Sequence, residues 1–257
     1  MMTIRLAQFP GALFLASFCA LWLSGRIGIR LRNDKRKVDE FEHADVSLIV
    51  ASTLTLLGLI IGFTFSMSIS RYEQRKLYEE NEANAIGTEY LRADLLDNTD
   101  AQRLHTMLEV YLRQRISFYQ LRNDGQLRQL DADGLKLQTE LWSTVVAEAS
   151  SNPSPLAALV ASGMNDVFNS KGYTQASWWN RIPISAWALM GSIAICSHIL
   201  LGYSILRGKD QSVAFLALIL VVSLSFFLIA DIDSPRRGMI RVRPENLISL
   251  SQSLHPQ

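Results

Sequence analysis

The sequence contains few of the residues that catalysis, metal binding and cross-linking most often use. Its two cysteines, Cys19 and Cys196, both lie inside apolar runs, which argues against a disulfide framework. The four histidines are scattered, and none has the spacing of a metal ligand in a His-Glu-x-x-His motif. A phosphate-binding glycine loop, a nucleophile elbow and a Cys-x-x-Cys pair are also lacking. We therefore expect neither an enzyme nor a cofactor or metal site.

The chain also lacks an excess of either charge. Its 25 lysines and arginines nearly balance its 24 aspartates and glutamates, for a formal net charge of +1. Nucleic-acid binding requires a clear basic surplus or stripe, so we expect no nucleic-acid partner. Strand signals are absent as well, and apolar residues recur at helical spacing, so the predicted fold class is all-α.

Four long apolar runs stand out against this background. They cover residues 6–24, 48–70, 184–206 and 212–230. Each is close to the ~20 residues that a helix needs to cross a ~30 Å hydrocarbon core. The first run also stands where a secretory signal would, but its length favours a retained helix. We predict an integral membrane protein with four transmembrane helices, the last two forming a hairpin around the short turn at 207–210.

The second apolar run passes without a break into a charged stretch, residues 71–86, which has no proline. Its composition is rich in good helix formers. One long helix is therefore expected to leave the bilayer and continue into water. On the soluble half we expect Leu77 and Ile86 to face a core, and Glu79 and Glu89 to face water.

The residues between the second and third runs predict a soluble helical insert, with further helices at 101–123, 135–150 and 155–169. The segment Asp131-Ala132-Asp133-Gly134 resembles part of a calcium loop but lacks the closing glutamate of an EF-hand, so we expect it to cap a helix. The predicted organisation is transmembrane helices 1 and 2 with a basic connector (1–70), the insert (71–181), the transmembrane hairpin (182–232) and a C-terminal tail (233–257).

Small residues recur every four positions in the second apolar run. This stripe comprises Gly58, Gly62, Ser66 and Ser70, and Thr64 and Ser68 beside it carry hydroxyls. Four-residue spacing places such residues on one face of a helix. The face has two interpretations: a close helix–helix contact of the small-xxx-small type, or the narrow polar lining of a pore. Both remain open at this point.

Charged residues gather where the second and fourth runs end. They are Arg71 and Glu73 after the second run, and Asp231, Asp233, Arg236 and Arg237 after the fourth. The two carboxylates could form an ion-attracting ring in an oligomer. They could equally pair with the arginines, including Arg71 and Arg75, and fix the geometry of the membrane exit.

The orientation in the membrane does not follow from charge. Four spans place both termini and the insert on one side, and short flanks on the two sides carry nearly equal numbers of basic residues. The basic connector, which includes Arg26, Arg30 and Arg32, either contacts anionic headgroups or helps to set the topology.

Three segments carry a resemblance to a known family. They are residues 62–67 (GFTFSM) with Arg71 and Tyr72, residues 82–92 (EANAIGTEYLR) and residues 231–238 (DIDSPRRG). Together they resemble a bacterial family of unknown function called bestrophin-like. Bestrophins proper are pentameric ion channels with four spanning helices, in which the second helix lines the pore neck and a helical cytosolic part extends the pore.

The resemblance implies a homo-oligomer, by analogy a pentamer, in the lipid bilayer of the cell inner (plasma) membrane, with inorganic ions as its cargo. It places the insert and both termini in the cytoplasm, the small-residue stripe near a pore axis, and Glu73 onward in a vestibule. The sequence departs from bestrophins proper in two respects. It has no aromatic neck triplet, and no acidic calcium clasp beyond Asp231 and Asp233. The alternative is a non-conducting membrane scaffold or sensor whose insert docks a partner.

Overall fold

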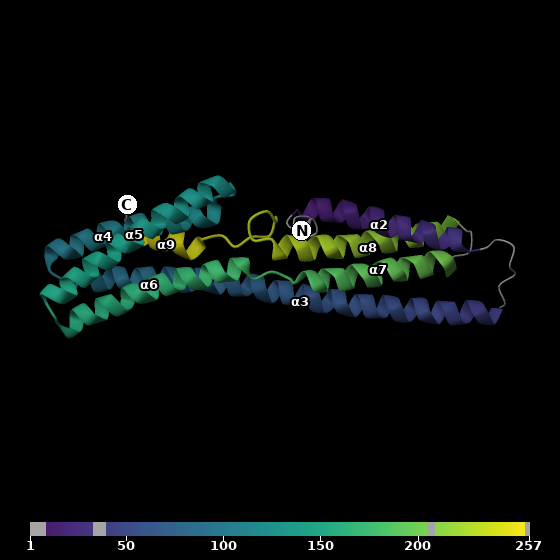
Figure 1. Cartoon of the computed structure of the whole chain (residues 1–257), viewed down its shortest axis with the longest axis horizontal. Coiled ribbons are helices and arrows are strands. Elements are labelled where there is room, and N and C mark those ends of the chain that lie inside the picture. The colour runs from purple at the N-terminus through teal and green to yellow at the C-terminus, as the bar shows by residue number, and fades with distance from the viewer. Residues whose placement is uncertain (1–8, 33–39, 205–208, 255–257) are drawn as a thin grey trace. The chain divides into compact units, whose positions relative to one another are not determined.

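The computed structural model describes residues 9–32, 40–204 and 209–254, and all regular elements in these ranges are α-helices (Figure 1). They are α2 (Pro10–Leu31), α3 (Glu40–Ala93), α4 (Asn98–Gln120), α5 (Asp124–Ser151), α6 (Pro155–Trp179), α7 (Ile184–Ser204), α8 (Lys209–Asp233) and α9 (Glu245–Leu254). The all-α prediction is confirmed. The start of the first predicted span, the middle of the basic connector and most of the turn at 207–210 lie outside the described residues.

Four stretches are long and apolar enough to cross a membrane. They are Pro10–Leu31, Val46–Ala93, Pro155–Ser204, which includes α7, and Ser212–Asp233. The long helix is also as predicted, because α3 runs for 54 residues from the second apolar run into the charged stretch. The chain is therefore a membrane protein of four spanning helices with a helical insert.

The chain forms two compact units. The membrane unit comprises residues 1–71 and 181–241, and the insert unit comprises residues 72–180 and 242–257. The first part of the tail thus packs with the membrane helices, and the second part, with α9, packs with the insert. Each unit has its own cluster of buried apolar side chains.

In the membrane unit, α2 packs closely against α7 and α8. The contact between α2 and α7 depends on glycine. A Cβ added at Gly28 would overlap the backbone carbonyl of Ile199, and one added at Gly202 would overlap the carbonyl of Gly25. Such close backbone approach is how small residues join membrane helices. It also explains why α2 stays helical to Leu31, whereas the sequence predicted a connector from residue 25.

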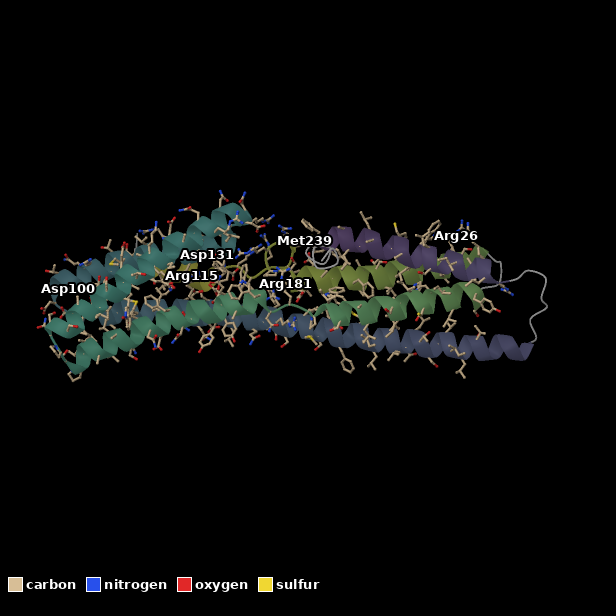
Figure 2. All side chains as sticks on the ribbon, viewed as in Figure 1. Arg26, Asp100, Arg115, Asp131, Arg181 and Met239 are labelled. Atoms are coloured by element: carbon tan, nitrogen blue, oxygen red, sulfur yellow. The ribbon has the colours of Figure 1, made fainter. Side chains whose placement is uncertain are left out.

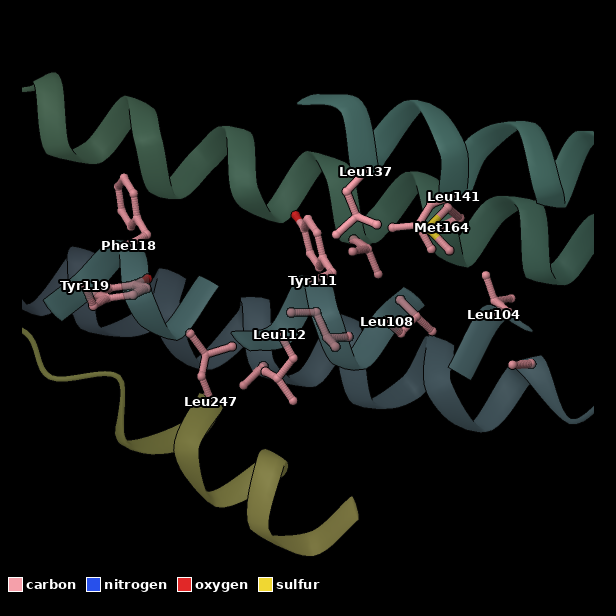
Figure 3. Close-up of a cluster of buried hydrophobic side chains, with 14 of the residues drawn as sticks. Leu104, Leu108, Tyr111, Leu112, Phe118, Tyr119, Leu137, Leu141, Met164 and Leu247 are labelled. Atoms are coloured by element: carbon pink, nitrogen blue, oxygen red, sulfur yellow. The ribbon is translucent and has the colours of Figure 1, made fainter. Parts of the chain in front are cut away.

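The core of the insert unit is built from the second half of α3 together with α4, α5, α6 and α9 (Figure 3). On α4 the buried residues follow helical spacing: Leu104, Leu108, Tyr111 and Leu112. Leu247 of α9 is fully buried in the same cluster. This contact docks α9 on the insert unit.

Three predicted helix boundaries in the insert are wrong. The segment at Asp131 and Gly134 lies inside α5 and caps nothing, because Asn123 caps that helix by accepting the backbone N–H groups of Gly125 and Gln126. Furthermore, α4 ends at Gln120 rather than at residue 123, and α6 continues to Trp179 instead of stopping near residue 169. The last turns of α6 are stabilised by core contacts, since Trp178 packs on Phe118 with ring centroids 4.8 Å apart.

The predicted faces of the soluble half of α3 are partly wrong. Ile86 is buried as expected, but Leu77 is 52% exposed, and Glu79 and Glu89 are fully buried. Glu79 is buried where α9 supplies hydrogen-bond donors to it, and Glu89 is buried where Gly163 of α6 covers it. A hydrophobic pattern cannot reveal either arrangement.

Candidate functional site

The small-residue stripe of α3 lies on the surface of the chain. Gly58, Gly62, Ser66 and Ser70 are all exposed. A Cβ added at Gly58 or Gly62 would meet no described atom within 4 Å. Within a single chain the stripe is therefore not a helix-packing contact, in contrast to Gly28 and Gly202.

The two hydroxyl residues beside the stripe point elsewhere. Thr64 and Ser68 are buried within the chain. Their hydroxyls donate to carbonyls of the same helix, Thr64 to Ile60 at 2.8 Å and Ser68 to Thr64 at 2.9 Å. Backbone carbonyls of the preceding turn thus satisfy both hydroxyls in an apolar environment.

A second exposed side of α3 is bulky and apolar. It includes Leu56, Phe63 and Met67, whose spacing of seven and four residues keeps them together on the helix. The membrane half of α3 therefore presents three sides: one buried in its own unit, one small and weakly polar, and one suited to lipid or to another chain.

At the membrane exit, Asp233 joins three segments of the membrane unit. Its carboxylate accepts the backbone N–H of Ile182 at 3.2 Å, and Arg71 of α3 forms an ion pair with it at 3.7 Å. Asp233 ends α8 and is buried, so a charge-assisted contact there holds α3, α8 and the start of α7 together.

Asp231 closes the turn that follows α8. Its two carboxylate oxygens accept the backbone N–H groups of Met239 and Ile240, each at 2.8 Å. Gly238 permits this closure, because a Cβ there would overlap the carbonyl of Asp231. Asp231 and Gly238 of the DIDSPRRG segment therefore fold the tail back on the end of α8.

The remaining charged candidates are distributed differently. Arg237 is exposed, and its guanidinium lies 4.4 Å from the ring centroid of Phe9. Arg236 is half-buried, and Glu73 is exposed on the insert unit's part of α3. The structure brings Arg71 and Asp233 together, but both Asp231 and Asp233 are turned into the protein rather than into water.

A buried polar network in the insert unit was not predicted from the sequence. Glu82 of α3 forms an ion pair with Arg115 of α4, and it also accepts hydrogen bonds from Tyr119 at 3.3 Å and from Thr174 at 3.1 Å. Burial raises the pKa of the Tyr119 phenol, with the Glu82 carboxylate acting in the same direction. Although burial by itself lowers the pKa of Arg115, the adjacent Glu82 raises it above its ordinary value.

A second buried glutamate connects α3 to the tail. Glu79 accepts the backbone N–H of Leu247 at 3.0 Å and the side-chain amide of Asn246 at 2.6 Å. Both residues are in the first turn of α9, where unpaired N–H groups and the helix dipole favour an anion. Glu79 thus caps α9 from another helix.

One signal could have identified this buried polar face. Ser68, Arg75, Glu82 and Glu89 are spaced by seven residues, and all four are buried. Seven-residue spacing keeps them on one side of α3, which a search limited to apolar residues passes over. Among the described residues, no group of three or more histidines, cysteines, aspartates or glutamates is placed to hold a metal ion.

Comparison with known proteins agrees with the observed fold. The chain matches the crystal structure of a bacterial bestrophin homologue from Klebsiella pneumoniae, carrying a point mutation, with a TM-score of 0.64 at 10% identity. That match covers 94% of this chain and 99% of the other. A second structure of the Klebsiella pneumoniae homologue gives a TM-score of 0.62 at 12% identity, covering 91% and 96% of the two chains. These likenesses establish a shared fold.

Among curated proteins, none matches the chain. A protein-family model does match, over residues 11–247, and its description is Bestrophin-like domain. Apart from Pro10, that range contains the four spans, and it also contains nearly the whole insert and the turn closed by Asp231. The resemblance carried by the three sequence segments is thereby confirmed, and the chain belongs to the Bestrophin-like family.

Proposed function

We propose that the protein is an oligomeric, passive ion channel in which α3 lines the pore. The observation that carries the proposal is the exposure of Gly58, Gly62, Ser66 and Ser70 along one side of a membrane-spanning helix. Exposed glycine and serine contribute little to lipid contact, whereas they leave room and supply oxygen atoms beside an axis shared by several subunits. Thr64 and Ser68 do not belong to this lining, because they are buried within the chain.

The family resemblance supplies the rest of the proposed assembly. By analogy with bestrophins proper, five copies would surround the pore in the inner (plasma) membrane, with the insert and both termini in the cytoplasm. Glu73, which is exposed, would lie in the vestibule. The ion pair of Arg71 with Asp233 would fix the lining helix at the membrane exit. This proposed function is the passage of inorganic ions and requires no catalytic step.

The test is ion flux into phosphatidylcholine liposomes containing the purified full-length protein, measured with potassium, sodium and chloride in turn. The critical variant is Gly62→Leu. Its side chain projects from the stripe, and we expect it to abolish flux while the oligomer mass in native mass spectrometry stays unchanged. Gly11→Leu is the matched control, because Gly11 is also an exposed glycine with no described atom within 4 Å of an added Cβ.

Two results would contradict the proposal. Collapse of the oligomer in Gly62→Leu, with Gly11→Leu intact, would identify the stripe as a contact between subunits. Absence of flux from a correctly assembled wild-type protein would favour the alternative, a scaffold or sensor whose insert docks a partner. The purified full-length protein would then be the bait for that partner.

A further inference from the structure

A cavity of about 490 Å³ lies in the membrane unit between α2 and α7. Its walls are formed largely by small and apolar residues, Ala16 and Ala20 of α2 and Ala188, Gly191 and Ile195 of α7. Ala16, Ala188 and Ile195 are exposed, so the cavity is open toward the outside of the helix pair. It is unrelated to the small-residue stripe, which lies on α3.

The size of the cavity corresponds to one lipid chain. Its lining on α7 extends from Ile184 to Ile195, which at ~1.5 Å per residue is about 16 Å. One leaflet supplies half of a ~30 Å hydrocarbon core, or about 15 Å. The lining is therefore as long as the acyl chain of one leaflet.

One end of the cavity is charged. Arg181, which precedes α7, lines this end (Figure 2), and Asp233 at the end of α8 lines it as well. The carboxylate of Asp233 already accepts from Ile182 and pairs with Arg71. Arg181 is half-buried and forms no ion pair within 4.0 Å with a described residue, although the charges of Asp233 and Arg237 both act on it. Trp187 lines the same region, and tryptophan favours the level of the lipid headgroups.

We propose that this groove binds one acyl chain of an anionic phospholipid, with the phosphate on Arg181. The apolar walls contact the acyl chain, and the guanidinium of Arg181 presents paired hydrogen-bond donors that match the oxygens of a phosphate. The lipid would fill the space between α2 and α7 beyond the close contact at Gly28 and Gly202. This assignment is independent of ion conduction, since it concerns another side of the membrane unit.

The test uses phosphatidylglycerol that carries a diazirine on one acyl chain, mixed into phosphatidylcholine vesicles containing the full-length protein. After illumination, we expect peptide mass spectrometry to locate the adducts on the lining segments of α2 and α7. Phosphatidylcholine with the same diazirine should label these segments several-fold less, because it lacks a net negative charge. Equal labelling by the two lipids would overturn the role of Arg181.

Substitutions at two positions test the binding of the acyl chain and the binding of the headgroup separately. Gly191→Leu should fill the groove with a side chain and so weaken binding of the acyl chain. We expect labelling to fall roughly tenfold, the change in affinity that corresponds to the usual energetic cost of overpacking. Gly11→Leu, outside the groove, should label as the wild type does. Arg181→Gln should bring phosphatidylglycerol labelling down to the phosphatidylcholine level, whereas Arg30→Gln, an exposed arginine in the last turn of α2, should not.

The proposal fails if Gly191→Leu labels as strongly as the wild type, or if the adducts fall on other helices. Should Gly191→Leu not fold, Ala188→Leu provides the same obstruction at an exposed position of the lining. A photoreactive amino acid at Ile195 identifies any other occupant. A cross-link between two protein chains, with no lipid adduct, would assign the groove to a neighbouring subunit and overturn the proposal.

Discussion

At the residue scale, the charged tail segment has a structural explanation that its composition alone did not supply. Asp231 and Asp233 were candidates either for an ion-attracting ring or for internal pairing. The structure uses both carboxylates internally, one on two backbone N–H groups of the tail and the other on Ile182 and Arg71. Sequence proximity could not distinguish these arrangements, because the partners of Asp233 lie 51 and more residues away.

This arrangement predicts the effect of removing one carboxylate. Asp231→Ala leaves the N–H groups of Met239 and Ile240 without their acceptor, so we expect a loss of about 1–3 kcal/mol in the free energy of unfolding. The measurement is denaturant unfolding of the detergent-purified protein, followed by tryptophan fluorescence. Glu73→Ala is the control, because that carboxylate is exposed and should change the midpoint little. An unchanged midpoint in Asp231→Ala would contradict the closing role of Asp231.

A buried carboxylate in the insert illustrates a limit of hydrophobic pattern reading at the same scale. Glu89 is fully buried, and neither of its carboxylate oxygens has a hydrogen-bond partner among the described residues. An added Cβ at Gly163 of α6 would overlap it, so the glycine makes room for it. The sequence predicted Glu89 in water because an isolated charge is ordinarily exposed. Only the position of α6 reverses that expectation.

At the scale of the elements, the structure separates two kinds of small-residue pattern. Gly58 and Gly62 form a clear four-residue stripe, yet they contact nothing in the chain. Gly28 and Gly202 form no regular pattern in the sequence, yet they bring the backbones of α2 and α7 together, and Gly25 leaves room for the ring of Phe215. Spacing predicts that glycines share a face, but it does not predict whether another helix covers that face.

The α2–α7 contact should therefore be sensitive to a single methyl group. Gly202→Ala places a Cβ against the carbonyl of Gly25, and backbone atoms cannot move aside without separating the helices. We expect a loss of about 1–3 kcal/mol in unfolding free energy, the usual cost of overpacking. Gly191→Ala is the matched control on the same helix, since its Cβ would meet open space. Equal unfolding midpoints for the two variants would contradict this account of the contact.

At the scale of the whole molecule, two exposed positions allow a test of the expected membrane orientation. Thr99 is exposed in the first turn of α4, and Arg30 is exposed at the end of α2. Because the α2 residues near Arg30 pack against the end of α7, they lie at the far side of the membrane unit from Arg181. Cysteine labelling at these two positions therefore reports on the two sides of the membrane.

We expect Thr99→Cys, in a chain with Cys19 and Cys196 replaced by alanine, to react with a membrane-impermeant maleimide only after the cells are permeabilised. Arg30→Cys should react in intact cells. The physical reason is the even number of spans, which keeps the insert on the side of both termini, together with the cytoplasmic insert that the family resemblance implies. The reversed labelling pattern would place the insert outside the cytoplasm.

The sequence by itself determined the helical class, the four spans, the continuity of α3 and the family. These depend on local quantities: run length, helix propensity, the absence of proline and short motifs. Only the tertiary structure decided which side of α3 is buried, which glycines join helices and what Asp231, Asp233 and Glu79 bind. The reason is that burial and hydrogen bonding belong to pairs of elements. A distant segment that supplies a partner offsets part of the desolvation cost of a buried charged residue, and that partner cannot be read from the local sequence.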